Sequence, residues 1–319
     1  MSVTSAFDDY QRHVNANLDS VKEARRRRDL FKSAFGAETD VVEVIASGSL
    51  RRGTQKDPIN DVDVIVIFDP DKHDAWGQPG TSAADALEHT RQRVNALLGA
   101  TNGTYAKEVR LARWHNHAVK CFLDDPEDPD RFTVDAMPAF RTPTGLMIPE
   151  ALSKDWVPSD PEHLIDAVAG QHAEWNKYAG TVRMLKCWTA QQDIKIKSLV
   201  MEVLALDLLP LDTTQPVAVK EFFVRAARHI EDGYTVEDPA GICGPIQPDI
   251  DYDEFGAKLR DAADLAAKAI NKQAIADHPQ AIHLWGDLFG DGFPIPPKAP
   301  GNPAVVPATP RPVKDTPQG

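Results

Sequence analysis

Two aspartates open an apolar run in the first third of the chain. Asp61 and Asp63 lie at the entrance of a segment, Val62–Phe68, whose β-branched and aromatic residues predict a buried strand. Residues two apart on a strand point to the same face, so both carboxylates are expected on one side. Such neighbours repel each other unless a cation lies between them, and magnesium, which takes oxygen ligands, fits that role.

A Gly-Ser pair lies just upstream of these aspartates. Gly48 and Ser49 follow a short apolar run, Val41–Ala46, that precedes the turn. Glycine lets backbone N–H groups approach a phosphate closely, and the serine hydroxyl adds a donor. One segment is therefore expected to supply both a phosphate cradle and half of a metal site.

The aspartates also admit a simpler interpretation, as turn and capping residues before a strand, because Asp-x-Asp alone is a weak signal. The order of Gly48-Ser49 and Asp61-x-Asp63, however, resembles the nucleotidyltransferase superfamily of the DNA polymerase β type. With Gly53-Thr54 after the turn, the pattern looks most like the cGAS/DncV-like nucleotidyltransferases, the bacterial cyclic-oligonucleotide synthases of CBASS anti-phage defence.

This resemblance implies a third carboxylate on a later strand, for which Asp135 in the segment Phe132–Ala139 is the candidate. The acidic, proline-containing turn 124–130 joins that segment to a strand predicted over Ala118–Leu123, as a hairpin. We expect the hairpin to bring Asp135 beside Asp61 and Asp63.

The resemblance also implies that Lys186 and Ser198 contact the nucleotide triphosphate. A lysine supplies a mobile positive charge, and a serine at a helix N-terminus presents donors to an anion. The alternative is a surface lysine and an ordinary capping serine. Lys195 and Lys197 are weaker candidates for the same phosphates, and the base-stacking residue is not assigned because Leu199 stands where animal relatives have tyrosine.

The reaction implied is attack of a ribose hydroxyl on the α-phosphate of a nucleoside triphosphate such as ATP or GTP, repeated to close a cyclic di- or trinucleotide. Two magnesium ions about 4 Å apart, with manganese as an alternative, would stabilise the attacking and leaving oxygens. Asp61 and Asp63 would hold both ions, and Asp135 would bind one and help deprotonate the hydroxyl. Transfer to an RNA end or a small-molecule hydroxyl, and a nucleotide-binding regulator without turnover, remain alternatives.

The predicted elements describe an α/β (α+β) fold of two lobes with the nucleotide in the cleft between them. A nucleotidyltransferase lobe with a mixed sheet covers 1–150 and begins with one long helix over about residues 5–35; strands are expected over 104–112 and 118–123, and a helix from 81 or 82. A loop-like crossover over 138–158 leads to a helical lobe, 151–293, that resembles that of oligoadenylate synthases. Its helices are expected over 160–192 with a break near Gly180, and over 198–209, 217–230, 252–272 and 279–289.

Two other clusters of polar residues admit a functional interpretation. The basic residues Lys22, Arg25–Arg28 and Lys32 are interpreted as a solvated helix face, the alternative being a docking or nucleotide-facing edge. His115, His117 and Cys121 share one strand face by spacing, but a fourth zinc ligand is not apparent, so alternating strand polarity explains them more simply.

The composition of the chain argues against membranes and nucleic acids as partners. Of 319 residues, 42% are hydrophobic and 26% are charged, as in globular proteins, and no apolar run is long enough to span a bilayer. The net charge of −13 argues against a surface that coats nucleic acid, and no Cys/His insertion matches that of the DNA-activated animal enzyme, so DNA activation is not expected. Three widely spaced cysteines predict a reducing, cytoplasmic setting.

The segment 294–319 predicts an extended or disordered tail, because nine of its 26 residues are proline. Its last residue, Gly319, and its proline-rich reach would suit a ubiquitin-transfer-like partner that joins a synthase tail to other molecules. The alternative is a featureless end.

Overall fold

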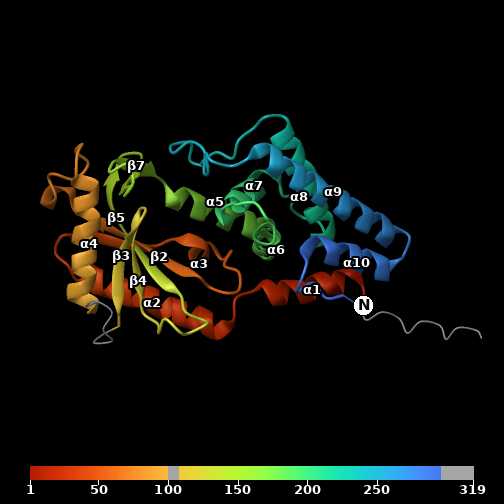
Figure 1. Cartoon of the computed structure of the whole chain (residues 1–319), viewed down its shortest axis with the longest axis horizontal. Helices are drawn as coiled ribbons and strands as arrows, with labels where there is room; N and C mark the ends of the chain where they lie inside the picture. The colour runs from red at the N-terminus through yellow and green to blue at the C-terminus, as the bar shows by residue number, and fades with distance from the viewer. Residues whose placement is uncertain (100–107, 296–319) are drawn as a thin grey trace, which may run out of the picture.

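A sheet lobe and a helical lobe lie side by side along the long axis of the molecule (Figure 1). The structure, a computed structural model, describes residues 1–99 and 108–295. Each lobe has its own hydrophobic core, and the two cores share no residue. The predicted fold class, a mixed α/β nucleotidyltransferase lobe with a helical second lobe, agrees with this architecture.

The sheet has seven strands in the order β1-β2-β5-β4-β3, with β6 and β7 continuing from β5. The strands are β1 (Val41–Ala46), β2 (Asp61–Phe68), β3 (Leu111–His115), β4 (Ala118–Phe122), β5 (Thr133–Thr142), β6 (Gly145–Pro149) and β7 (Trp156–Ser159). β2 and β5 pair in parallel, and the other pairs are antiparallel. The sheet is therefore mixed, as expected.

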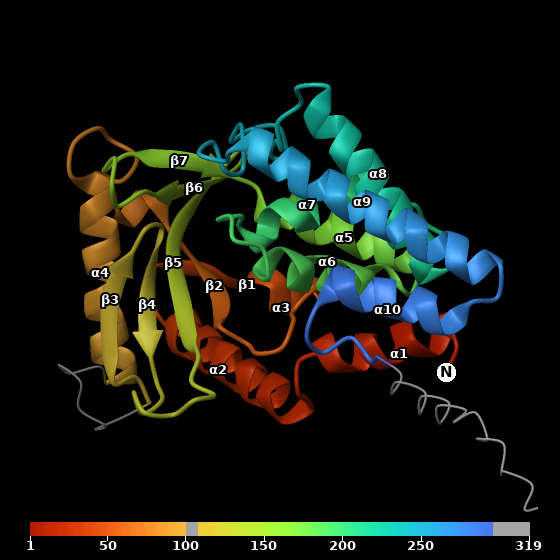
Figure 2. The ribbon, with the colours of Figure 1, turned by 45° about the vertical axis from the view of Figure 1, so that its right-hand side comes forward.

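The alternation of β2 decides which of its side chains face the cleft. Val62, Val64, Val66 and Phe68 pack against α2 (Leu18–Gly36) and α4 (Ser82–Leu98) in one core. Asp61 and Asp63 have the opposite orientation because successive strand side chains alternate. That second face carries α3 (Gly48–Arg52), which lies between the sheet and the helical lobe (Figure 2).

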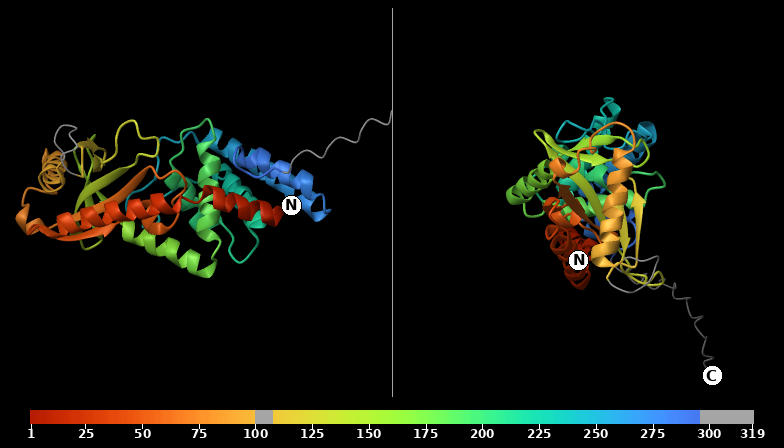
Figure 3. Two further views of the ribbon diagram at one scale, coloured as in Figure 1. Left: turned by 90° about the horizontal axis from the view of Figure 1, so that it is seen from below. Right: turned by 90° about the vertical axis from the view of Figure 1, so that its left-hand side faces the viewer.

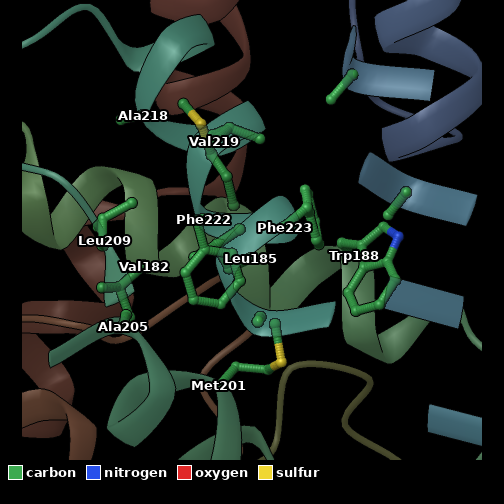
Figure 4. Close-up of a cluster of buried hydrophobic side chains, with 14 of the residues drawn as sticks. Val182, Leu185, Trp188, Met201, Ala205, Leu209, Ala218, Val219, Phe222 and Phe223 are labelled. Atoms are coloured by element: carbon green, nitrogen blue, oxygen red, sulfur yellow. The ribbon is translucent and has the colours of Figure 1, made fainter. Parts of the chain in front are cut away.

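The helical lobe contains seven helices among the residues described. They are α1 (Val3–Val14), α5 (Pro161–Glu174), α6 (Tyr178–Ala190), α7 (Ser198–Leu208), α8 (Gln215–Glu231), α9 (Tyr252–Ala274) and α10 (His278–Phe289). Figure 4 shows part of its core, where apolar side chains of α6, α7 and α8 meet around Phe222 and Phe223. The helices predicted over 198–209, 217–230, 252–272 and 279–289 all occur, with ends that differ by three residues or fewer.

The long N-terminal helix predicted over residues 5–35 is wrong, because the structure has two helices there (Figure 3). Asn15 leaves the helix in an extended conformation and pairs with Lys56, and the Asn17 side chain caps the next helix by accepting a hydrogen bond from Asp19 N–H. Moreover α1 packs into the core of the helical lobe, so the N-terminal residues do not belong to the sheet lobe alone.

Three further boundaries differ from the predictions. The segment 138–158 is not a loop, because β5 runs on to Thr142 and pairs with β6. The first strand of the hairpin begins at Leu111 rather than Thr104, and residues 104–107 lie outside those described. The break in the 160–192 helix falls at residues 175–177 rather than at Gly180, because Trp175 is extended. Nearly all of the predicted tail, from residue 296 onward, also lies outside the described part.

Of the helices that the structure describes, none combines the length and the apolar composition that a bilayer crossing requires.

Candidate active site

The three predicted carboxylates meet at one end of the parallel strand pair. Asp61 and Asp63 are the first and third residues of β2, and Asp135 of β5 is in register with Asp63. Registered residues on neighbouring strands lie about 5 Å apart and point to the same face. The structure therefore brings Asp61, Asp63 and Asp135 to the same face of the sheet, on which the hairpin β4–β5 also places Lys120 opposite Asp135.

Burial and mutual repulsion act together on these carboxylates. Burial, followed by the charges of Asp61 and Asp135, raises the pKa of Asp63 to about 7. Burial also raises the pKa of Asp135, although Lys120, whose Nζ lies 3.2 Å from Asp135 Oδ2, partly offsets that rise. A divalent cation bound by oxygen ligands would relieve this repulsion, so the donor set fits magnesium or manganese.

Gly48 is held against the carboxylate of Asp63. Its φ is +69°, and a Cβ at this position would lie 1.7 Å from Asp63 Oδ2. The neighbouring Ser47 N–H donates to the backbone oxygen of Asp63 at 3.0 Å, which fixes the turn against β2. Glycine is therefore required here for the close approach of the turn to the Asp63 carboxylate, in addition to the close approach to phosphate expected from the sequence.

A cleft of about 360 Å³ joins this end of the sheet to the helical lobe. Its lining includes Gly48, Ser49, Asp61, Asp63, Lys186 and Ser198. The seventh predicted site residue, Asp135, lies beside Asp63 on β5. The cleft thus brings together predicted site residues of the sheet lobe and the two predicted triphosphate residues of α6 and α7.

Lys186 is buried rather than free on the surface. Its Nζ donates to Glu202 Oε2 at 2.9 Å and to the backbone oxygen of Thr54 at 3.2 Å. Arg52 Nε donates to Glu202 Oε1 at 2.5 Å, and the Thr54 hydroxyl donates to the same oxygen at 2.8 Å. We call Arg52, Thr54, Lys186 and Glu202 the interlobe network, because Arg52 and Thr54 follow β1 whereas the other two lie on α6 and α7.

Opposite charges keep the side chains of the interlobe network ionised. Burial would raise the pKa of Glu202, but Lys186 and Arg52 outweigh that effect and lower it to about 2. Burial lowers the pKa of Lys186, and its bond to Glu202 opposes that change. Two cations therefore share one carboxylate, which leaves a net positive charge at the cleft wall.

Sequence reasoning missed Glu202, Arg52 and Thr54. Glu202 did carry a signal, because it is a single acid within the apolar run Val200–Ala205. A charge at the centre of such a helix requires a buried partner. Its partners, at 148 and 150 residues' separation, could not be assigned from spacing alone.

Ser198 is the first residue of α7 and is exposed in the cleft, so its hydroxyl is open to a ligand. Lys195 and Lys197 are also exposed but are not part of the cleft lining described. His115, His117 and Cys121 do not come together as metal ligands among the described residues; the His117 ring bonds to Pro149 O and Cys121 is buried in the core.

Residues 1–171 match the family model of the Second Messenger Oligonucleotide or Dinucleotide Synthetase domain. The chain belongs to this synthetase family. The cGAS/DncV-like resemblance read from Gly48-Ser49 and Asp61-x-Asp63 is thereby confirmed, and the protein is a nucleotidyltransferase of the second-messenger class.

Relatives of this synthetase match nearly the whole chain. A probable cyclic nucleotide synthase of Bacillus cereus (strain VD146) is 24% identical over 338 residues, which cover 92% of this chain and 98% of that protein. The structure of Escherichia coli MS115-1 CdnC with ATP is 16% identical with a TM-score of 0.69, and 92% of this chain and 99% of CdnC are covered. Bradyrhizobium diazoefficiens CdnG in complex with GTP has a TM-score of 0.66 at 12% identity, with 90% and 95% coverage.

Proposed function

We propose that this synthetase condenses nucleoside triphosphates into a cyclic di- or trinucleotide messenger of anti-phage signalling, with magnesium at Asp61, Asp63 and Asp135 and release of pyrophosphate. The observation that carries the proposal is the convergence of three carboxylates on adjacent strands at the base of a cleft shared by both lobes. ATP and GTP are the first candidates for substrates, since they are bound in the CdnC and CdnG structures.

The carboxylate side of the cleft would carry the chemistry. When bound there, magnesium would stabilise the attacking and leaving oxygens of the displacement. Asp61 and Asp63 would hold ions from one strand. Asp135 would hold an ion from the neighbouring strand and accept the proton of the attacking ribose hydroxyl. Lys120, whose Nζ lies 3.2 Å from Asp135 Oδ2, supports this proposal by orienting the carboxylate.

The triphosphate would be held from both sides of the cleft. Gly48 and Ser49, beside the carboxylates, offer backbone N–H groups, whereas the Ser49 hydroxyl donates to Gln55 Oε1. From the helical lobe, Ser198 offers a hydroxyl at the start of α7. Lys186 contributes through the excess positive charge that it and Arg52 hold over Glu202. This excess charge would attract the triphosphate to the helical side of the cleft, with its α-phosphate next to the ions held by the carboxylates.

Product analysis tests the function. The purified protein is incubated with magnesium and all four ribonucleoside triphosphates, one of them labelled at the α-phosphate in each reaction, without an added acceptor. We expect a phosphatase-resistant cyclic product whose mass identifies the bases, and no product from Asp61→Asn/Asp63→Asn. In a parallel reaction with an added RNA or small-molecule acceptor, label found only in that acceptor would favour transfer to another acceptor. Nucleotide binding without turnover would favour a regulator.

A protein partner is the second part of the proposal. The E. coli CdnC structure that shares this fold is a complex with HORMA-deltaN, so that relative assembles with a protein. We propose that this synthetase also takes a regulatory partner, either on its folded surface or through the proline-rich segment 294–319, in a cytoplasmic setting. Deletion of 310–319 distinguishes the two: synthesis in vitro should persist, and partner-dependent conjugation should be lost only if the tail is the attachment point.

A further inference from the structure

Two imidazoles and a carboxylate converge at the end of the sheet remote from the cleft. Asp40 lies in the turn before β1, His73 follows the 3-10 helix η1 (Pro70–Lys72), and His89 lies on α4. Among the described residues, these three form a group whose ligand atoms all lie within 4.8 Å of one another. They are separated along the sequence, and no helix repeat or turn motif explains their meeting.

The distances are those of a first-row metal site. Asp40 Oδ2 lies 3.1 Å from His73 Nε2 and 3.5 Å from His89 Nε2. Tetrahedral ligands at 2.0–2.1 Å from an ion lie about 3.3 Å from each other. Both rings present Nε2 to the same side, so a single ion could bind the two imidazoles and the carboxylate without rearrangement of the backbone.

The Nε2 atom of His89 faces Asp40 Oδ2 at 3.5 Å, longer than an ordinary hydrogen bond. Nε2 of His89 is buried and has no hydrogen-bond partner among the described residues. A buried polar atom without a partner costs about 1–3 kcal/mol. The nearest acceptor, Asp40 Oδ2, is already bonded to the His73 ring.

Aromatic walls hold both rings in place. The His73 ring stacks on Trp76 with centroids 4.2 Å apart, and it meets the fully buried Phe68 edge-on at 5.3 Å. His89 also packs edge-on against Phe68 at 5.5 Å and against Trp76 at 5.8 Å. Fixed ring orientations reduce the ordering cost of binding an ion.

The surroundings of Asp40 suit a ligating carboxylate. Arg93 donates to both of its oxygens, at 3.1 and 3.3 Å, as the outer partner that ligating carboxylates commonly have. Arg93 also pairs with Glu38, so its positive charge is offset before an ion arrives. Asp40 then supplies the net negative charge that attracts a divalent cation.

We propose that Asp40, His73 and His89 bind one divalent transition-metal ion of the zinc type. The ion would cross-link the segment after β2, through His73, to α4, through His89, and to the turn before β1, through Asp40. This site differs from the active-site carboxylates, because β2 separates its Phe68 end from Asp61 by about 23 Å at the rise of a strand. The ion would therefore lie outside the proposed reaction centre, with water in the position that the three residues leave open, and imidazole nitrogens select zinc-type ions over magnesium.

The test is a zinc titration of the full chain after removal of metals with a chelator. A chromogenic indicator reports the affinity, and the wild type is compared with His73→Gln, His89→Gln and Asp40→Asn. His172→Gln, which changes an exposed histidine on α5, is the matched control. X-ray absorption at the zinc edge of the wild-type protein reports the ligands directly, whatever the stability of the variants.

We expect one equivalent of zinc that the wild type and His172→Gln bind alike and that the three site variants bind about 100-fold more weakly or not at all. Zinc should raise the melting temperature of the wild type but not that of the site variants, and the absorption edge should contain two imidazole ligands. Equal titration of all five proteins, or an edge without imidazole scattering, would overturn the proposal.

Discussion

At the scale of single residues, the contact between Gly48 and Asp63 governs the site. Two requirements meet at Gly48: a backbone in the left-handed region and an open side toward the carboxylate of Asp63. Asp63 in turn remains buried next to two like charges, which raises its pKa. This arrangement destabilises the ionised Asp63, as is expected of a pair that serves the proposed binding of a cation and phosphate.

Gly48→Ala should reduce turnover by about 100-fold, because the new methyl group must displace the Asp63 carboxylate by more than 1 Å. The measurement is the initial rate of pyrophosphate release. Gly53→Ala is the matched control, since its φ of +71° imposes similar backbone strain of about 1 kcal/mol while a Cβ there meets nothing within 4 Å. Equal loss of rate in both variants would show that strain, not the carboxylate, is responsible.

Asp63→Asn should abolish product and yet stabilise the protein when divalent ions are chelated. The pKa of Asp63 in the folded protein is raised from 3.8 to about 7, so the folded state binds this proton more tightly than the unfolded state. Ionisation of Asp63 therefore lowers the stability of the folded protein as the pH rises from about 4 to about 7. The increase in melting temperature should therefore be present at pH 8 and vanish near pH 4. Asp166→Asn, at an exposed position of α5, should change neither quantity; destabilisation of Asp63→Asn at pH 8 would contradict the charge argument.

At the scale of elements, alternation and turn chemistry predicted the strands that hold the carboxylates. The apolar run after Asp61 predicted β2 and the alternation of its two faces. The acidic turn before Phe132 predicted the hairpin β4–β5, whose second strand carries Asp135. The break at Asn15–Asn17 and the strands β6 and β7 were missed. The break depends on pairing with the distant backbone of Lys56, which local patterns do not report. β6 and β7 form local hairpins, but their prolines and Gly145 favoured a loop in the prediction.

Ser198→Ala should weaken binding of a non-hydrolysable nucleoside triphosphate by about 1.5–3 kcal/mol, the value of a hydrogen bond to a charged group. The residue begins α7 and is exposed, so the melting temperature without nucleotide should not change. Calorimetric titration measures the affinity, with Ser33→Ala on the exposed face of α2 as the control. Unchanged affinity in both variants would make Ser198 a structural residue.

At the scale of the whole molecule, the interlobe network fixes one lobe against the other below the cleft. Composition and helix patterns predicted that two lobes exist, and the family resemblance placed the cleft between them. The network that joins them could not be predicted, because its partners belong to elements of different lobes and lie 132 to 150 residues apart in the sequence. The structure also gives Lys186 a second role: substituting it would leave Glu202 with fewer partners, so a loss of nucleotide binding in Lys186→Ala would not by itself demonstrate phosphate contact.

Glu202→Gln should destabilise the protein by about 3–5 kcal/mol, since it leaves Lys186 and Arg52 buried next to each other without their shared anion. Urea unfolding measures the change, and Glu231→Gln, which breaks the exposed pair with Arg260, should cost less than about 1 kcal/mol. The folded pKa of Glu202 is lowered from 4.5 to about 2, so its contribution is complete above pH 4.5 and is lost as the pH falls toward 2. The wild type should therefore lose stability in that acid window, and Glu202→Gln should lose less. A network that only filled space would give the same acid profile for both proteins, and that result would remove the interlobe network as the electrostatic link between the lobes.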